Sequence, residues 1–141
     1  EKFEKNPNFV LERGIIPSNL FHNSLCMISD WSGVSLEYAF VLEKPVLFVD
    51  VPKKINNTDF EKIHCEDIET NIRRDVGYII SPNEIENVLK KINSLLENSD
   101  KFRKQIRQVR SKTVFNIGGS ATVGAKYIAK IADESKAMNK F

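Results

Sequence analysis

Short apolar runs separated by more polar stretches predict β-strands in the first half of the chain. The runs from Leu25 to Ile28 and from Val46 to Val49 are apolar throughout, which is typical of parallel strands covered on both faces. Gly77 to Ile80 predicts one further strand, and Asn8 to Glu12 is a shorter β-like run. A short helix is expected from Pro17 to Phe21, because proline is favoured in the first turn of a helix.

Between the two buried strands the spacing of apolar residues changes to that of a helix. The pattern covers Val34 to Glu43, and Lys44-Pro45 ends it. The apolar stripe of this helix is expected to contain Val34, Tyr38, Val41 and Leu42. A strand, a helix and a second strand with short connections form a βαβ unit, which is right-handed and builds a parallel sheet. We therefore predict an α/β fold.

The second half of the chain has a helical pattern, after a polar loop over residues 52–67. Ser81-Pro82 opens a helix whose apolar residues recur at i, i+3, i+4, i+7 and i+10. They are Ile85, Val88, Leu89, Ile92 and Leu95. Ser99 to Phe115 is a basic amphipathic helix with an apolar stripe of Phe102, Ile106 and Val109. Its basic face can bind phosphates or a membrane surface, but an ordinary solvated face is the commoner explanation and is favoured.

A last helix is predicted after the break at Gly118-Gly119, with Ser120 as its cap. Its core stripe is expected to contain Val123, Tyr127, Ile128 and Ile131. Residues 134–141 are expected to be frayed. The sequence therefore predicts one domain over residues 1–133 with a helical C-terminal end, a size that suits the length of 141 residues.

Composition and charge narrow the class of protein. Lys and Arg number 21 against 19 acidic residues, so the net charge of +2 gives no reason to expect a nucleic-acid partner. Cys26 lies in an apolar run and is interpreted as a buried thiol, which fits a reducing compartment. No apolar stretch approaches the ~20 residues of a membrane span. Because the chain begins with Glu1, we expect it to be a fragment of a longer protein.

The turn from Ser29 to Gly33 is the main candidate for chemistry. In a parallel sheet, ligands bind beyond the carboxyl ends of the strands, and the unpaired N–H groups at a helix start favour an anion such as a diphosphate. Ser29 and Ser32 add hydroxyl donors, and Gly33 lets a phosphate approach the backbone. The alternative is that Asp30 or Ser32 only caps the helix.

Glu37 supports the ligand interpretation of this turn. It follows the turn by about one helical turn within an apolar helix, where a carboxylate costs free energy unless it is exposed or has a polar partner. A capping box built on Ser32 would place Glu or Gln at position 35, where the chain has Ser35. We interpret Glu37 as an acceptor for the ribose hydroxyls of a nucleotide. A solvated carboxylate near the positive end of the helix is the alternative.

The stretch "ISDWSGVSLEYAFVLEKPVLFVDVP" resembles the donor-binding segment of the CDP-glycerol glycerophosphotransferase family. That family makes teichoic acids and related surface polymers and has the GT-B glycosyltransferase fold. Ser29, Asp30, Ser32 and Gly33 match the family pattern, with Trp31 in place of the usual tyrosine. The resemblance is strongest from Leu25 to Pro52 and is weaker but collinear as far as the C-terminal helix.

The resemblance implies a Rossmann-like domain, the second of the two domains of a GT-B enzyme. The first domain, which carries the acceptor site and much of the catalytic machinery, would then be missing from this chain. His22 and His64 match none of the family's histidine segments, so the catalytic residues stay unknown. Lys53 and Lys54 follow the second buried strand and either reach the donor phosphates or are simply solvated.

The implied activity is transfer of glycerol phosphate or a sugar from a nucleotide-diphosphate donor, such as CDP-glycerol, to a hydroxyl of a polymer or lipid-linked acceptor. The donor would contact Ser29, Asp30, Trp31, Ser32, Gly33 and Glu37, with Trp31 shaping or covering the pocket, and no metal or other cofactor is implied. The implied location is the cytoplasm, extending to the inner face of the bacterial cell membrane, where the family finds its acceptors.

Two further interpretations of the same residues stay open. One is a GT-B enzyme of different chemistry, a nucleotide-sugar epimerase or hydrolase. The other is a non-catalytic flavodoxin-like interaction domain in which Ser29 and Ser32 are only caps. A flavodoxin-like receiver domain would be expected to show clustered acidic residues at its first strand end, and none precedes Asp30.

Overall fold

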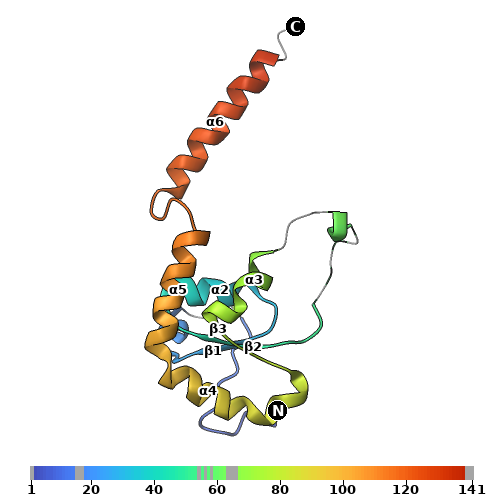
Figure 1. The fold of residues 1–141 in the computed structure, drawn as a ribbon, viewed down its shortest axis with the longest axis vertical. Helices are drawn as coiled ribbons and strands as arrows, with labels where there is room; N and C mark the ends of the chain where they lie inside the picture. The colour runs from blue at the N-terminus through green and yellow to red at the C-terminus, as the bar shows by residue number, and fades with distance from the viewer. Residues whose placement is uncertain are drawn as a thin grey trace.

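A computed structural model describes residues 2–14, 18–53, 55, 57, 59–62 and 67–138 of the chain (Figure 1). The fold is α/β, with a parallel three-stranded sheet in the order β1-β2-β3. The strands are β1 (Met27–Ser29), β2 (Val46–Val49) and β3 (Gly77–Ile80). In register, Met27 pairs with Val46, and Val46 with Gly77. The predicted β2 and β3 are confirmed with the same bounds.

Helices connect and cover the strands. The α-helices are α1 (Ser18–Asn23), α2 (Gly33–Leu42), α3 (Ile68–Val76), α4 (Val88–Glu97), α5 (Ser99–Thr113) and α6 (Ser120–Met138). Two 3₁₀ segments are η1 (Phe60–Lys62) and η2 (Pro82–Asn87). Figure 1 shows α2 and α3 on one side of the sheet, α4 on the other, and α5 along one end. The two βαβ crossovers place α2 and α3 on the same face, as right-handed connections require.

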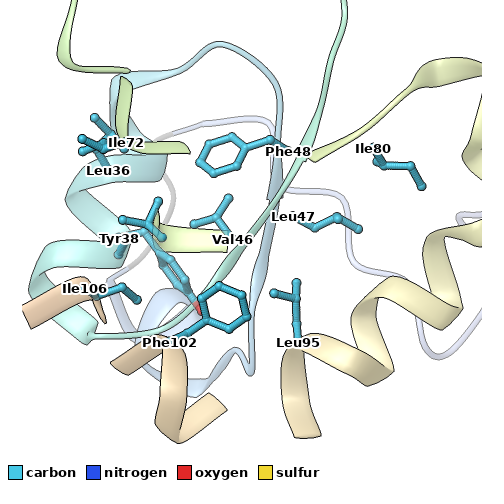
Figure 2. Close-up of a cluster of buried hydrophobic side chains, with 12 residues drawn as sticks. Leu36, Tyr38, Val46, Leu47, Phe48, Ile72, Ile80, Leu95, Phe102 and Ile106 are labelled. Atoms are coloured by element: carbon cyan, nitrogen blue, oxygen red, sulfur yellow. The ribbon is translucent and has the colours of Figure 1, made fainter. Parts of the chain in front are cut away.

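The hydrophobic core is centred on β2. Val46, Leu47 and Phe48 are fully buried, because β2 has a neighbouring strand on each side and helices over both faces. Figure 2 shows the side chains that gather around it. They come from α2 (Leu36, Tyr38), α3 (Ile72), β3 (Ile80), α4 (Leu95) and α5 (Phe102, Ile106). The predicted stripe of α5 is therefore confirmed.

The strand predicted over Leu25 to Ile28 is confirmed in part as β1, but its expected burial and the strand expected over residues 8–12 are wrong. Leu25 precedes β1 and is exposed, and Ile28 within β1 is 52% exposed. Among the described residues β1 pairs with β2 alone and lies at an edge of the sheet. The exposure of Ile28 shows that one face of this strand is not covered. Residues 8–12 form no strand in the described part of the chain, and all of them are exposed.

The buried face of α2 differs from the predicted stripe. Tyr38 is buried, but Val34 and Val41 are exposed, whereas Ser35 and Ala39 face the core. This helix has apolar residues on nearly all sides, so its spacing alone did not determine which face is buried. The helix predicted from Ser81-Pro82 is divided into η2 and α4, and Ile85 on η2 and Leu89 on α4 are likewise exposed.

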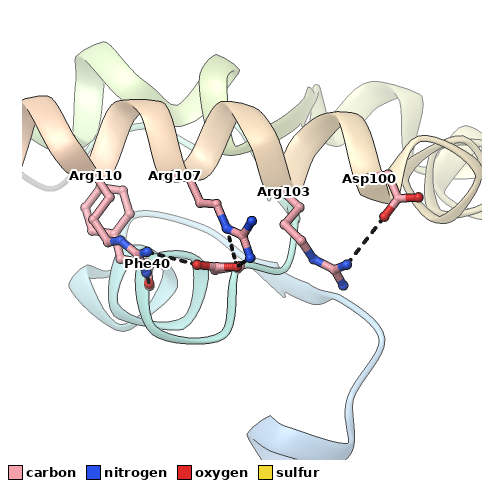
Figure 3. A network of polar contacts seen from close by, with 6 residues as sticks. Phe40, Asp100, Arg103, Arg107 and Arg110 are labelled. Carbon is pink, nitrogen blue, oxygen red and sulfur yellow. Dashed lines mark hydrogen bonds and ion pairs between the residues drawn. The ribbon is translucent and has the colours of Figure 1, made fainter.

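Two of the basic residues on α5 hold α2 in place (Figure 3). Glu43 follows α2 in the left-handed conformation, with φ of 55°. Its carboxylate accepts from Arg107 at 2.6 Å and from Arg110 at 2.8 Å, and Arg110 also donates to the carbonyl oxygen of Phe40. The hydrogen bond from Arg107 lowers the pKa of Glu43. This part of the basic face therefore has a structural role.

The helix α6 extends away from the rest of the molecule in Figure 1. Its predicted core stripe is wrong, because Val123, Tyr127, Ile128 and Ile131 are all exposed. The chain changes direction between α5 and α6 at Asn116 and Gly118, both with positive φ. Ser120 is the first residue of α6, and the helix continues to Met138 into the segment expected to fray.

A side chain at Gly77 is predicted to prevent the sheet from forming. A Cβ atom there would lie 1.6 Å from the carbonyl oxygen of Val46, in the backbone of the central strand. Gly77→Ala should therefore lower the free energy of unfolding by at least about 3 kcal/mol in urea denaturation. The control is Gly124→Ala on α6, where no atom lies within 4 Å, and it should stay within about 1 kcal/mol of wild type. Equal stability of the two variants would contradict the register of β2 and β3.

Candidate functional site

The candidate site lies at the carboxyl edge of the sheet. Ser29 ends β1, and the turn to Gly33 leads directly into α2. Asp50 follows β2, and its N–H donates to the carbonyl oxygen of Ile80 at the end of β3, at 2.8 Å. The connections that leave the three strands therefore begin side by side, which is where open parallel sheets bind ligands.

The turn presents the start of α2 without a side-chain cap. Ser32 has the extended backbone of an N-cap residue, but its hydroxyl caps none of the described N–H groups. Its carbonyl oxygen instead accepts from the hydroxyl of Ser35 at 2.6 Å. The capping alternative therefore fails for Ser32, and its hydroxyl is available at the helix start. Asp30, in the same turn, is exposed.

Trp31 ties the turn to the next connection of the sheet. Its indole Nε1 donates to the carbonyl oxygen of Val51 at 2.8 Å. The guanidinium carbon of Arg73 stacks 3.9 Å from the centroid of the indole ring, and the Lys53 ammonium lies 5.2 Å from it. The indole is thus occupied by protein contacts, and it fixes the turn relative to the segment that follows β2.

Arg73 is a site residue that the sequence analysis missed. It lies on α3 with a side chain only 4% exposed, and its Nη1 donates to Asp50 Oδ1 at 2.8 Å. The signal in the sequence was its position on α3, directly after the apolar Ile72 and three residues before Val76. A basic side chain on the same helix face as two core residues is buried with them. A buried guanidinium needs hydrogen-bond or ion-pair partners to offset its lost hydration.

Glu37 lies at an apolar groove between α1 and α2. The side chain is exposed, and it borders a cavity of about 210 Å³. The other lining residues are Ser18, Phe21, His22, Val34, Tyr38, Val41 and Leu42. Glu37 therefore places an exposed carboxylate beside an apolar groove, one helical turn from the Ser29–Gly33 turn.

A second carboxylate stands beside the turn itself. A Cβ atom at Gly33 would lie 3.4 Å from Glu69 Oε1, so the α3 carboxylate lies close to the first residue of α2. A negative charge is stabilised there by the N-terminal end of the helix. An anionic ligand at the turn would be repelled by Glu69 unless the side chain moved away.

The other predicted residues take structural positions or lie outside the described part. Lys53 bonds the carboxylate of Asp67 and lies 3.1 Å from the hydroxyl of Thr70. Nδ1 of His22 lies 2.8 Å from the carbonyl oxygen of Ser18, in the preceding turn. The thiol of Cys26 is half-buried, and burial raises its pKa. Lys54 and His64 lie outside the described residues.

Three comparisons of the chain, with protein-family models, with curated proteins and with solved structures, find no match. The described residues include no helix with the length and apolar character needed to cross a membrane. They also contain no group of three or more His, Cys, Asp or Glu side chains placed to hold a metal ion. The assignment of a function therefore depends on the geometry of the site.

The pH dependence of stability should include a contribution from Asp67. Hydrogen bonds from Lys53 and then Thr70 lower the pKa of this N-cap carboxyl from 3.8 to about 2. Because the pKa is lower in the folded state, the carboxylate stabilises the fold above about pH 4. That stabilisation is lost as the pH falls toward 2.

Asp67→Asn should therefore be less stable than wild type by about 0.5–1 kcal/mol at pH 6, since the pair is partly exposed. The difference should shrink between pH 4 and pH 2 in urea denaturation. Asp133→Asn on α6 is the control and should show no such trend. A constant difference from pH 6 to pH 2 would show that the charge of Asp67 has no part in it.

Proposed function

We propose that this chain is the donor-binding part of a transferase that moves glycerol phosphate or a sugar from a nucleotide-diphosphate donor to an acceptor hydroxyl. The observation that carries the proposal is the uncapped start of α2 at the carboxyl edge of the sheet, with Glu37 one helical turn further on. The N–H groups there would bind the diphosphate, together with the hydroxyls of Ser29 and Ser32. The carboxylate of Glu37 would accept hydrogen bonds from the ribose.

The groove between α1 and α2 suits the nucleobase. Its walls are apolar at Phe21, Val34 and Val41, as expected for a surface that packs against a planar ring. The cavity of about 210 Å³ has room for one base beside the ribose held by Glu37. Phosphate, sugar and base would then follow α2 in order from its first residue toward its end.

The N–H groups of the turn would stabilise the negative charge that develops on the leaving nucleotide. As the acceptor hydroxyl attacks, the bond between the transferred group and the nucleotide breaks, and negative charge grows on the phosphate oxygens that stay with the nucleotide. Fixed N–H groups at the helix start stabilise that charge without a large rearrangement. A general base for the acceptor hydroxyl belongs, in this proposal, to the first domain that the family resemblance implies. An epimerase or hydrolase of the GT-B fold would use the same turn.

Two contacts near the turn favour the non-catalytic interaction domain as a second candidate. Glu69 already places a carboxylate beside Gly33, and Lys53 is engaged by Asp67. In an interaction domain the carboxylate of Glu69 stabilises the start of α2, and no nucleotide displaces it. In the transferase proposal, Glu69 opposes the diphosphate and sets a limit on affinity.

Two substitutions with the same change in charge distinguish these candidates. If the transferase proposal is right, Glu37→Gln should weaken binding of CDP or UDP about tenfold, because the ribose loses a charged acceptor. Glu69→Gln should strengthen binding several-fold, because a like charge next to the diphosphate is removed. Isothermal titration calorimetry at low salt measures both.

The matched control for both variants is Glu97→Gln, at the end of α4, which should bind like wild type. Denaturation curves that coincide for the variants would show that the changes in affinity do not come from unfolding. No binding of CDP or UDP by the wild-type chain at millimolar concentration would favour the interaction domain. Equal effects of Glu37→Gln and Glu69→Gln would contradict the placement of ribose and diphosphate.

A further inference from the structure

The buried guanidinium of Arg73 is incompletely paired. Its Nη1 donates to Asp50, but Nε and Nη2 find no hydrogen-bond partner among the described residues. Its flat faces contact aromatic rings, with the guanidinium carbon 3.9 Å from the centroid of Trp31 and 4.9 Å from that of Phe48. The residue therefore stands between the core strand β2 and the indole of the Ser29–Gly33 turn.

This arrangement is a poor way to stabilise a fold. A buried cation loses its hydration, and each unpaired N–H group adds to the cost, so an apolar side chain of similar size often serves stability equally well. Asp50, the partner of Arg73, is 51% exposed and remains hydrated without it. Buried polar groups that lack partners occur preferentially where a protein has a function.

What Arg73 does in this position is hold Trp31. The indole is fixed on one face by the guanidinium and at its edge by the hydrogen bond to Val51. Trp31 lies in the middle of the turn, between Asp30 and Ser32. Restriction of its side chain limits the backbone conformations of the turn, and with them the direction of the Ser32 hydroxyl and of the first N–H groups of α2.

We propose that Arg73 is a positioning residue, which holds the Ser29–Gly33 turn through Trp31 in the conformation that receives the ligand's diphosphate. The inference rests on the function proposed above for its ligand, whereas its effect on Trp31 can be measured without any ligand. Arg73 makes no contact with the ligand in this proposal. Its substitution should therefore change affinity and the environment of Trp31 more than stability.

The test compares Arg73→Met with Arg74→Met, its exposed neighbour on the same helix. Trp31 is the only tryptophan of the chain, so fluorescence reports on the turn alone. In Arg73→Met the acrylamide quenching constant should rise at least twofold, and the Kd for CDP should increase about tenfold. The thermal midpoint should stay at or above that of wild type. Arg74→Met should match wild type in all three measurements.

A second variant covers the case in which Arg73→Met does not fold. Arg73→Lys keeps the charge but lacks the planar group that stacks on the indole, so it should show a partial increase in quenching and in Kd. A lower thermal midpoint with unchanged quenching and Kd would make Arg73 a stability residue and overturn the proposal.

The two proposals can fail separately. If wild type binds neither CDP nor UDP, the proposed function is wrong, and the diphosphate role of Arg73 falls with it. The difference in quenching between Arg73→Met and Arg74→Met still decides whether Arg73 fixes the turn. Arg73→Met could instead show the quenching constant of wild type together with a tenfold higher Kd. Arg73 would then act on the ligand by another route, and the proposal would also be overturned.

Discussion

The burial of Val46, Leu47 and Phe48 in β2 is the constraint on which the rest of the structure depends. A strand enclosed by a neighbour on each side and by helices on both faces fixes the register of β1 and β3. The approach of Gly77 to the backbone of Val46 leaves no room for a side chain at that position. Because the strands are parallel and in register, their carboxyl ends meet at one edge. The turn into α2 and the start of the next connection are therefore brought together by the sheet itself.

Charge is the second feature that shapes the candidate site. Arg73 is paired with Asp50, and Lys53 with Asp67, while Glu69 stands close to the start of α2. A ligand that brings a diphosphate to this edge must compete with a carboxylate already there. Among the described residues, the two cations nearest Trp31, Lys53 and Arg73, each already contact a carboxylate. In the proposed complex the backbone of α2 and the nearby hydroxyls therefore supply direct contacts to phosphate. Such a site gains affinity from geometry more than from net charge.

Much of the fold could be predicted because some segments admit only one interpretation. The segment from Val46 to Val49 is short and entirely apolar, as a buried strand is. In the basic helix α5 the large apolar residues are Phe102 and Ile106, so only the face that carries them can be buried. The burial of β1 and the stripe of α6 could not be predicted. Periodicity shows that a face is apolar but not whether another element covers it, and that depends on sheet edges and on the direction of the chain after Gly118.

The position of the candidate turn could be predicted from the sequence, but the side chains that surround it could not. The turn from Ser29 to Gly33 follows from the order of strand and helix. The neighbours that complete it, Arg73 and Glu69, come from α3, more than thirty residues further along the chain. Contacts of that kind depend on how α3 packs over the sheet. For the same reason, the expectation that Trp31 covers a pocket missed its stacking on Arg73.

The most direct test of the account is a titration of the isotope-labelled chain with CDP and with UDP, followed by amide NMR spectra. The largest shifts should appear at residues 29–37, from the turn into the first turns of α2. Amides of α6 should not move, because that helix lies away from the site (Figure 1). The absence of shifts at residues 29–37 at millimolar nucleotide, or shifts confined to other elements, would contradict the assignment of a nucleotide site to this turn.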